Sequence, residues 1–152
     1  MLRLLFSVGF MGALASGLGN PAVADDLVAQ DQTPSGRFLT ATEVKPILAA
    51  TTANWIAVRE YDGNDWVYVT HLWAWRCGLL QIELGINGAT PEVWPMPDCR
   101  EETAQPTAIL DSDGLPARTY AKGSVQSMTI TLTYDDLSTQ TESFTRAKTL
   151  IP

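Results

Sequence analysis

The chain has 152 residues, of which 45% are hydrophobic and 18% charged, with ten basic and seventeen acidic side chains. This composition is typical of a globular protein with enough chain for one hydrophobic core. Because the net charge is −7 at pH 7, nucleic acids and anionic membrane surfaces are excluded as favourable partners, whereas a cationic protein is compatible with it.

The first 24 residues have the pattern of a secretory signal peptide. Arg3 precedes an apolar run over residues 4–18, and Ala22-Val23-Ala24 matches a cleavage site. An uncleaved membrane anchor is the alternative, but the run contains glycines and is shorter than the ~20 residues that span a bilayer. Cleavage leaves nine basic and seventeen acidic residues, a net charge of −8 with His71 neutral. The sequence therefore predicts a periplasmic or secreted protein without a membrane span.

Residues 25–36 are polar and aperiodic, which predicts a flexible segment before a single globular domain over residues 37–152. A helix is predicted over residues 41–51. Thr40 and Glu43 have capping-box spacing, and apolar residues follow at helical intervals. Pro46 lies beyond the first turn if Thr40 is the cap, so the pattern favours a cap at Thr42 or a kinked helix.

A β-hairpin is predicted over residues 54–75, with its turn at Asp62-Gly63-Asn64. A two-residue turn at Asp62-Gly63 and one at Gly63-Asn64 both place the same side chains on the same face of the hairpin. The core face then contains Ile56, Val58, Val67, Val69, His71 and Trp73. The opposite face contains Trp55, Arg59, Tyr61, Trp66 and Tyr68.

These five residues form the candidate binding site, because aromatic residues and arginine are enriched at binding hot spots. An arginine over an exposed aromatic ring contributes about 0.5 to 1 kcal/mol. The alternative is that the helix, the loop over residues 100–122 or a second layer of sheet covers this face.

A second hairpin is predicted around Asn87-Gly88, pairing Leu84 with Pro91 and Ile82 with Val93. Residues 66–86 are strand-like throughout, but a straight strand of that length does not fit in a domain of this size. The apolar residues stand at odd-numbered positions up to Cys77 and at even-numbered positions after Gly78. This switch indicates a bulge or a sheet corner at Cys77-Gly78. The predicted register also places two carboxylates, Glu83 and Glu92, opposite each other.

Cys77 and Cys99 are the only cysteines, and an exported chain passes through an oxidising compartment, so a disulfide is predicted. In the chain-entropy model a bridge of this loop size contributes about 3 kcal/mol. A metal site made from both cysteines, His71 and Met96 is an alternative, but the spacing of metal-binding motifs is missing. No metal or cofactor is predicted.

The C-terminal half is predicted to contain a long loop, a short strand over residues 107–110, and a hairpin. Residues 124–134 alternate between apolar and polar side chains, and residues 139–147 form the return strand with Phe144 inward, beside Ile130. The predicted fold is α+β, an antiparallel sheet of about six strands in three hairpins with one short N-terminal helix and a disulfide.

The function predicted from these features is non-enzymatic binding in the cell envelope, to a protein or an envelope polymer. One version is an acidic inhibitor of a cationic partner, such as a lysozyme-like enzyme. The alternative is a small periplasmic hydrolase that uses His71 or a Glu83/Glu92 carboxylate pair. The alternation of side chains along the predicted strand favours a core position for His71. The two glutamates are expected to be solvated. The oligomeric state is not determined by the sequence.

Overall fold

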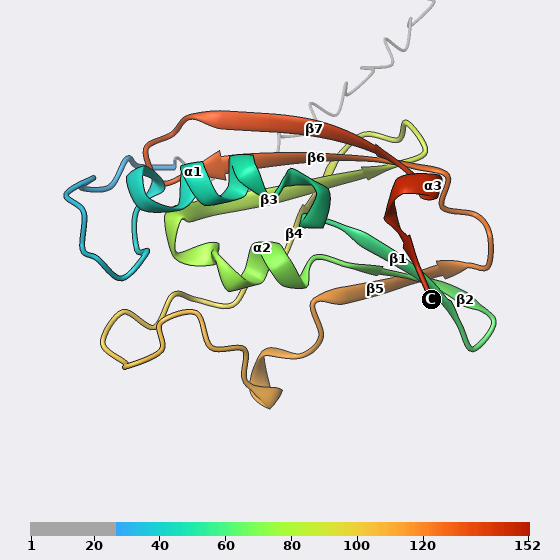
Figure 1. Ribbon diagram of the computed structural model, residues 1–152, viewed down its shortest axis with the longest axis horizontal. Coiled ribbons are helices and arrows are strands. Elements are labelled where there is room, and N and C mark those ends of the chain that lie inside the picture. Colours follow the sequence, from blue (N-terminus) through green and yellow to red (C-terminus); the bar gives the residue numbers. More distant parts are fainter. Residues whose placement is uncertain (1–26) are drawn as a thin grey trace, which may run out of the picture.

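The computed structural model describes residues 27–152 and contains two four-stranded sheets, with strand orders β5-β2-β1-β8 and β4-β3-β6-β7 (Figure 1). The strands are β1 (Ala57–Tyr61), β2 (Asn64–Tyr68), β3 (Leu79–Ile86), β4 (Glu92–Trp94), β5 (Ala117–Ala121), β6 (Ser127–Tyr134), β7 (Thr139–Thr145) and β8 (Leu150–Ile151). The helices are α1 (Ala41–Ala50), α2 (Thr70–Ala74) and α3 (Arg146–Thr149). The predicted α+β class is confirmed, but the prediction of one antiparallel sheet of about six strands with one helix is wrong, because residues 27–152 contain eight strands in two sheets and three α-helices. The predicted signal peptide lies outside the described residues.

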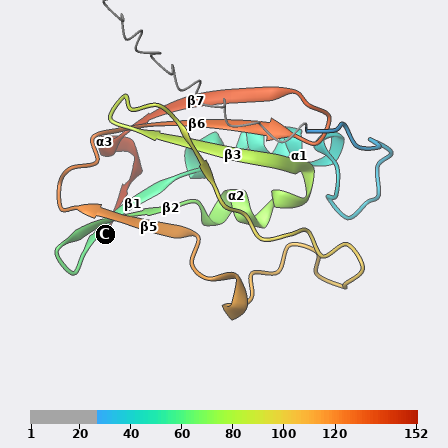
Figure 2. The same ribbon diagram turned by 180° about the vertical axis from the view of Figure 1, so that it is seen from behind.

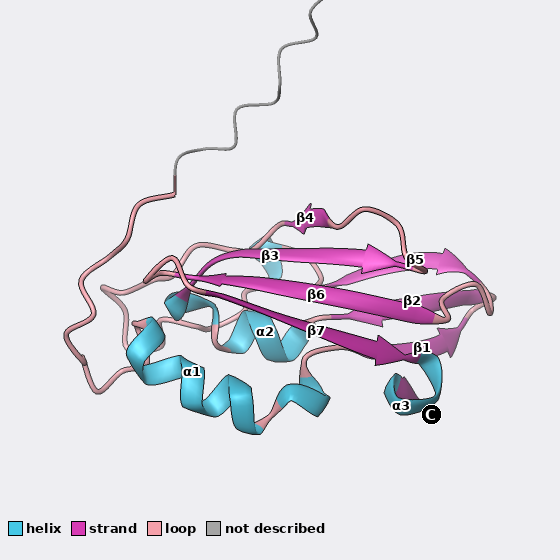
Figure 3. Cartoon of the chain, turned by 90° about the horizontal axis from the view of Figure 1, so that it is seen from above, coloured by secondary structure: helices cyan, strands magenta, loops and turns pink. Residues whose placement is uncertain are grey.

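The two sheets lie in separate layers. In Figure 1 the sheet of β3, β6 and β7 is above, and β1, β2 and β5 lie beneath its right half. Helix α2 lies beneath its left half, and the view from behind in Figure 2 shows the same arrangement. Figure 3 shows that α1 runs along one side of these layers. The second sheet, α1 and α2 thus provide the cover that one apolar sheet face needs.

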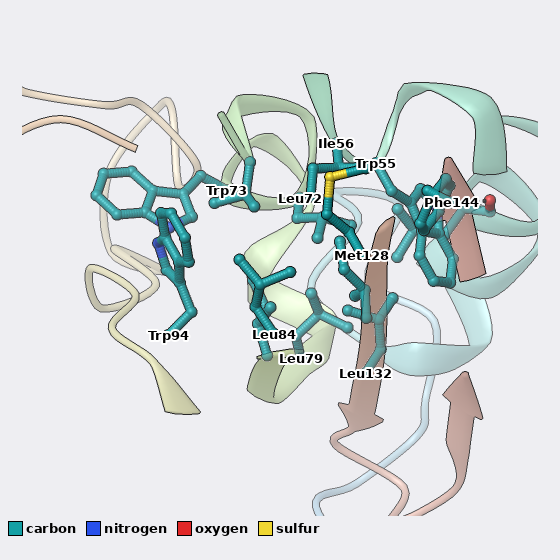
Figure 4. Packing of buried hydrophobic residues seen from close by; sticks show 14 of the residues in the cluster. Trp55, Ile56, Leu72, Trp73, Leu79, Leu84, Trp94, Met128, Leu132 and Phe144 are labelled. Atoms are coloured by element: carbon teal, nitrogen blue, oxygen red, sulfur yellow. Dashed lines mark hydrogen bonds between the residues drawn. The ribbon is translucent and has the colours of Figure 1, made fainter. Parts of the chain in front are cut away.

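The core lies between these layers. Strand β6 alternates as predicted, with Met128, Ile130, Leu132 and Tyr134 buried and the intervening threonines only partly buried. Figure 4 shows two aromatic pairs at opposite ends of the core. Trp73 lies beside Trp94 at one end, and Trp55 lies beside Phe144 at the other.

The first hairpin turns at Asp62-Gly63, as predicted, because Tyr61 pairs with Asn64. Its second strand, however, ends at Tyr68. Residues 70–74 form α2, and a 3₁₀ turn follows over Arg76–Gly78, so the predicted strand through Trp75 is wrong. Because a helix advances less per residue than a strand, these helical turns shorten the path of the chain. Residues 66–86 therefore fit in the domain, as one straight strand would not.

The register of the second hairpin differs from the prediction by one residue. The turn at Asn87-Gly88 is present, and the Ala89 amide donates to the Ile86 carbonyl at 2.9 Å. Pairing then begins at Leu84 with Glu92, so an extra residue lies between the turn and β4. Pro91 explains the shift, since it has no amide proton to donate. Glu83 pairs with Val93, and the predicted Glu83/Glu92 pair is wrong.

The third hairpin has a three-residue loop, because Thr133 pairs with Thr139 and the Tyr134 amide donates to the Ser138 carbonyl. Phe144 is buried, as predicted, but its cross-strand partner is Met128 rather than Ile130. In the preceding segment, residues 107–110 form no strand, and the strand is β5 instead.

Helix α1 begins after Thr40, so the preference for a cap at Thr42 was wrong, and Pro46 lies inside the helix. The Glu43 carboxylate accepts hydrogen bonds from the amides of Gly36 (2.6 Å), Leu39 (2.9 Å) and Thr40 (3.2 Å). Burial raises the pKa of Glu43, but hydrogen bonds from the Ser35 hydroxyl, from the amides of Leu39 and Gly36 and from the Thr40 hydroxyl outweigh it and lower that pKa to about 2.

Cys77 and Cys99 form the predicted disulfide, with their Cα atoms 4.9 Å apart. The N-terminal segment contacts the same end of the molecule. The Gln30 amide donates to the Asp135 carbonyl, and Gln32 Nε2 donates to the Asp135 carboxylate, each at 2.7 Å. The flexibility of residues 25–36 stays a prediction.

Gly78 is the point of closest approach between the 3₁₀ turn and α1. A Cβ atom there would lie 2.4 Å from Val44 Cγ2 and 2.9 Å from the Thr40 carbonyl oxygen. We therefore expect Gly78→Ala to destabilise the protein by about 1 to 3 kcal/mol, the usual range for overpacking. Urea unfolding of the disulfide-bonded protein measures this, and an unchanged midpoint would show that α1 can move aside without cost.

Candidate functional site

Four of the five predicted binding residues lie on the outer face of the β1–β2 hairpin. Arg59 pairs with Trp66, and Tyr61 and Tyr68 point to the same side, alternating with buried residues. Tyr61 is 58% exposed, Arg59 is exposed, and Trp66 and Tyr68 are half-buried. We call Arg59, Tyr61, Trp66 and Tyr68 the aromatic face.

The fifth residue, Trp55, does not belong to this face. It has 0% exposure, packs near Phe144, and its indole Nε1 donates to the Leu48 carbonyl at 3.0 Å. Strand β1 begins only at Ala57, after a 3₁₀ turn over Thr52–Asn54, so the strand alternation that placed Trp55 outward does not extend to it.

The aromatic face is pre-arranged by contacts among its own members. The rings of Trp66 and Tyr68 are stacked, with centroids 6.3 Å apart and planes 20° apart. The Arg59 guanidinium carbon lies 5.3 Å from the centre of the Tyr61 ring. Within residues 27–152 Arg59 forms no ion pair with a carboxylate. The face therefore presents an arginine charge that no ion pair with an acid of this range neutralises.

An open pocket of about 410 Å³ adjoins the aromatic face. Its volume falls within the range of small-molecule sites. It is lined by Asn54, Ala57, Arg59, Tyr68, Thr70, His71 and Ile151. Sequence reasoning missed this pocket because two of its walls come from elements it did not predict, namely α2 and β8, which pairs in parallel with β1.

His71 lines the pocket and forms a side-chain hydrogen bond with Thr51. Its predicted core position is wrong, because it lies on α2 and is only half-buried. The Thr51 hydroxyl donates to the Ile47 carbonyl at 2.7 Å, so its oxygen accepts from His71 Nε2 at 2.8 Å. The neutral ring therefore carries its proton on Nε2, which leaves the Nδ1 lone pair as an acceptor. Burial lowers the pKa of His71, which favours this neutral form at pH 7.

The pocket is lined by one cationic side chain, Arg59, by the His71 ring and by apolar side chains. Among the described residues, the side-chain hydrogen bonds of His71 include no carboxylate that would orient the ring as a base. Glu83 and Glu92 lie at non-paired positions on adjacent strands, so alternation directs them to opposite faces.

Residues 27–152 contain neither a metal-ion cluster nor a membrane-spanning helix. No group of three or more His, Cys, Asp or Glu side chains there is placed to hold a metal ion. In the same range no helix has the length and apolar character needed to cross a bilayer. No family model, curated protein or solved structure matches the chain.

Proposed function

We propose that the protein is exported and acts as a non-enzymatic binding protein of the cell envelope, with the aromatic face and the adjoining pocket as its binding site. The observation that carries this proposal is that the half-buried rings of Trp66 and Tyr68 stack on the outer sheet face, directly beside a pocket that Tyr68 and Arg59 help to line. A concave site with adjacent aromatic residues and an arginine has the features of a binding hot spot.

The groups on this face also lose little freedom when a ligand binds. Tyr and Trp side chains have few rotatable bonds, and here the ring stacking and the contact between Arg59 and Tyr61 already restrict them. The disulfide supports the exported setting, since such bridges persist in oxidising compartments.

The version in which the protein inhibits a cationic partner would use a different surface. The aromatic face carries Arg59, which disfavours a cationic partner there. Exposed acids lie instead next to Cys99 and on the segment that follows it, at Asp98, Glu101, Glu102 and Asp111. Within this proposal the aromatic face is therefore assigned to a neutral or anionic ligand.

A hydrolase that uses His71 is the second candidate, favoured by the position of His71 in an open pocket with Nδ1 unused. It predicts ester hydrolysis that falls at least about tenfold in His71→Gln and follows the titration of one histidine. Hydrolysis at the same rate in both proteins would exclude it.

Retention on isolated cell-envelope fractions tests the main proposal. The purified protein is mixed with sacculi and, separately, with solubilised envelope proteins, and the bound fraction is measured. We expect Tyr61→Ser and Trp66→Ser to reduce retention at least about fivefold, because each removes an aromatic contact.

The matched control for this test is Tyr120→Ser, a tyrosine of β5 that packs against the core. Comparison of all variants at equal folded concentration, set by circular dichroism, separates loss of binding from loss of folding. Retention that is equal in Tyr61→Ser, Trp66→Ser and the parent protein would overturn the proposal.

A further inference from the structure

We infer that the pocket beside the aromatic face binds a small organic acid, with the ligand carboxylate on Arg59 and an aromatic or branched apolar group against the pocket wall. This inference rests on the proposed function and specifies the ligand of the same site. Each part of it follows from the residues that line the pocket.

The charge of the pocket selects an anion. Among residues 27–152, Arg59 is the single charged residue that lines it, and no aspartate or glutamate of that range does so. The adjacent Glu60 does not neutralise Arg59. It points to the other side of β1, where its carboxylate pairs with Arg146 and Lys122. A guanidinium without an internal partner can form two parallel hydrogen bonds to one carboxylate.

The remaining lining residues select the rest of the ligand. Ala57, Ile151 and the ring of Tyr68 provide apolar surface, while Asn54 and Thr70 provide polar groups. Ile151 reaches this position because β8 pairs in parallel with β1, which places it next to Arg59. An apolar wall next to a cation matches an amphipathic acid and disfavours a strongly hydrated inorganic anion.

His71 provides a spectroscopic probe inside the pocket. It is the only histidine in the chain, so its ring signals in a ¹H–¹³C NMR spectrum need no assignment. Because its ring lines the pocket, an occupant changes the chemical shift of these signals. The same spectrum shows whether a variant is folded, since the hydrogen bond to Thr51 fixes the ring in the folded state.

The test is a titration of the purified, disulfide-bonded protein at pH 7 with three probes that share one ring. The probes are phenylacetate, its neutral amide phenylacetamide, and the cation phenethylamine. We expect phenylacetate to shift the His71 signals saturably, the amide to bind at least about tenfold more weakly, and the amine to produce no saturable shift. Arg59→Gln is expected to weaken phenylacetate binding at least about tenfold, which corresponds to loss of a charge-assisted hydrogen bond.

The matched control is Arg118→Gln, which removes an arginine that contacts the Trp94 ring and does not line the pocket. It should bind phenylacetate with unchanged affinity. Equal affinity for acid and amide, absence of saturation with phenylacetate, or unchanged binding in Arg59→Gln would overturn the inference. If these outcomes occur while Tyr61→Ser and Trp66→Ser still reduce retention on envelope fractions, the inference fails and the proposed function stands.

Discussion

Replacing Arg76 by methionine is expected to destabilise the protein by at least about 3 kcal/mol, because its buried side chain donates to five backbone carbonyls at once. Arg76 is 2% exposed. It donates to the carbonyl oxygens of Trp73 (3.0 Å), Asp98 (3.2 Å), Pro106 (3.3 Å), Thr107 (2.7 Å) and Ala108 (3.0 Å). Each carbonyl that remains buried without a donor costs about 1 to 3 kcal/mol, and local relaxation recovers part of that.

Urea unfolding with the disulfide intact measures this effect. Arg76→Lys should be destabilised almost as much, because an ammonium group has three donors and lacks the planar fork that spans these carbonyls. Arg118→Gln is the control, since Arg118 lies over the Trp94 ring at 4.4 Å and should cost about 1 kcal/mol or less. A loss for Arg76→Met no larger than that of the control would show that the loop over residues 98–108 folds without this arginine.

The turns of this fold were predictable because the residues that form them have few alternatives. Asp62 and Asn87 have φ values of +48° and +52°, a conformation that Asp, Asn and Gly adopt most readily. Each is followed by a glycine that also has a positive φ. The alternation of β6 was equally clear, because eight residues of strict period two fit only a half-buried strand.

The segment that forms the pocket was misread because it is too short for periodicity to decide. Apolar residues at Val69, Trp73 and Trp75 fit the alternation of a strand, yet five residues form α2 here. In the helix His71 moves from the core to the rim of the pocket, and Leu72 becomes buried. The strand prediction therefore put His71 in the core and left the pocket without one wall.

Partners far apart in the sequence account for the rest of what sequence reasoning missed. Arg76 finds its acceptors up to 32 residues away, and no local pattern indicates them. Asp65, which looks like an ordinary turn-flanking acid, pairs with Arg146 across 81 residues. The Glu83/Glu92 pair failed for a local reason, since one residue next to Pro91 was enough to change its register.

Asp65→Asn is expected to destabilise the protein by about 3 kcal/mol at pH 7, the second large effect. Asp65 is fully buried on β2, and its carboxylate accepts from the amides of Gly123 (2.9 Å) and Val125 (3.0 Å). Arg146 donates to both of its oxygens, at 2.7 and 3.1 Å. An asparagine cannot accept all four hydrogen bonds, and it leaves Arg146 with only part of its charge compensated.

The dependence of this loss on pH distinguishes the ion pair from simple packing. The hydrogen bonds from Arg146, followed by those from the two amides, lower the pKa of Asp65 from 3.8 to about 2. Because the folded-state pKa is below the unfolded-state value, ionised Asp65 stabilises the protein above about pH 4 and stops doing so as the pH falls through 2. This pH-dependent part is on the order of 2 kcal/mol.

Urea unfolding of the parent protein and Asp65→Asn at several pH values from 7 down to 2.5 tests this. The difference in unfolding free energy should be largest at neutral pH and should shrink below pH 4. Glu43 and Asp136, whose pKa values are also lowered to about 2, are present in both proteins, so their contributions cancel in the difference. Asp111→Asn, at an exposed acid, should show a small difference at every pH. A large difference for Asp65→Asn that stays constant with pH would assign the loss to packing, since the titrating group that differs between the two proteins is the carboxylate of Asp65.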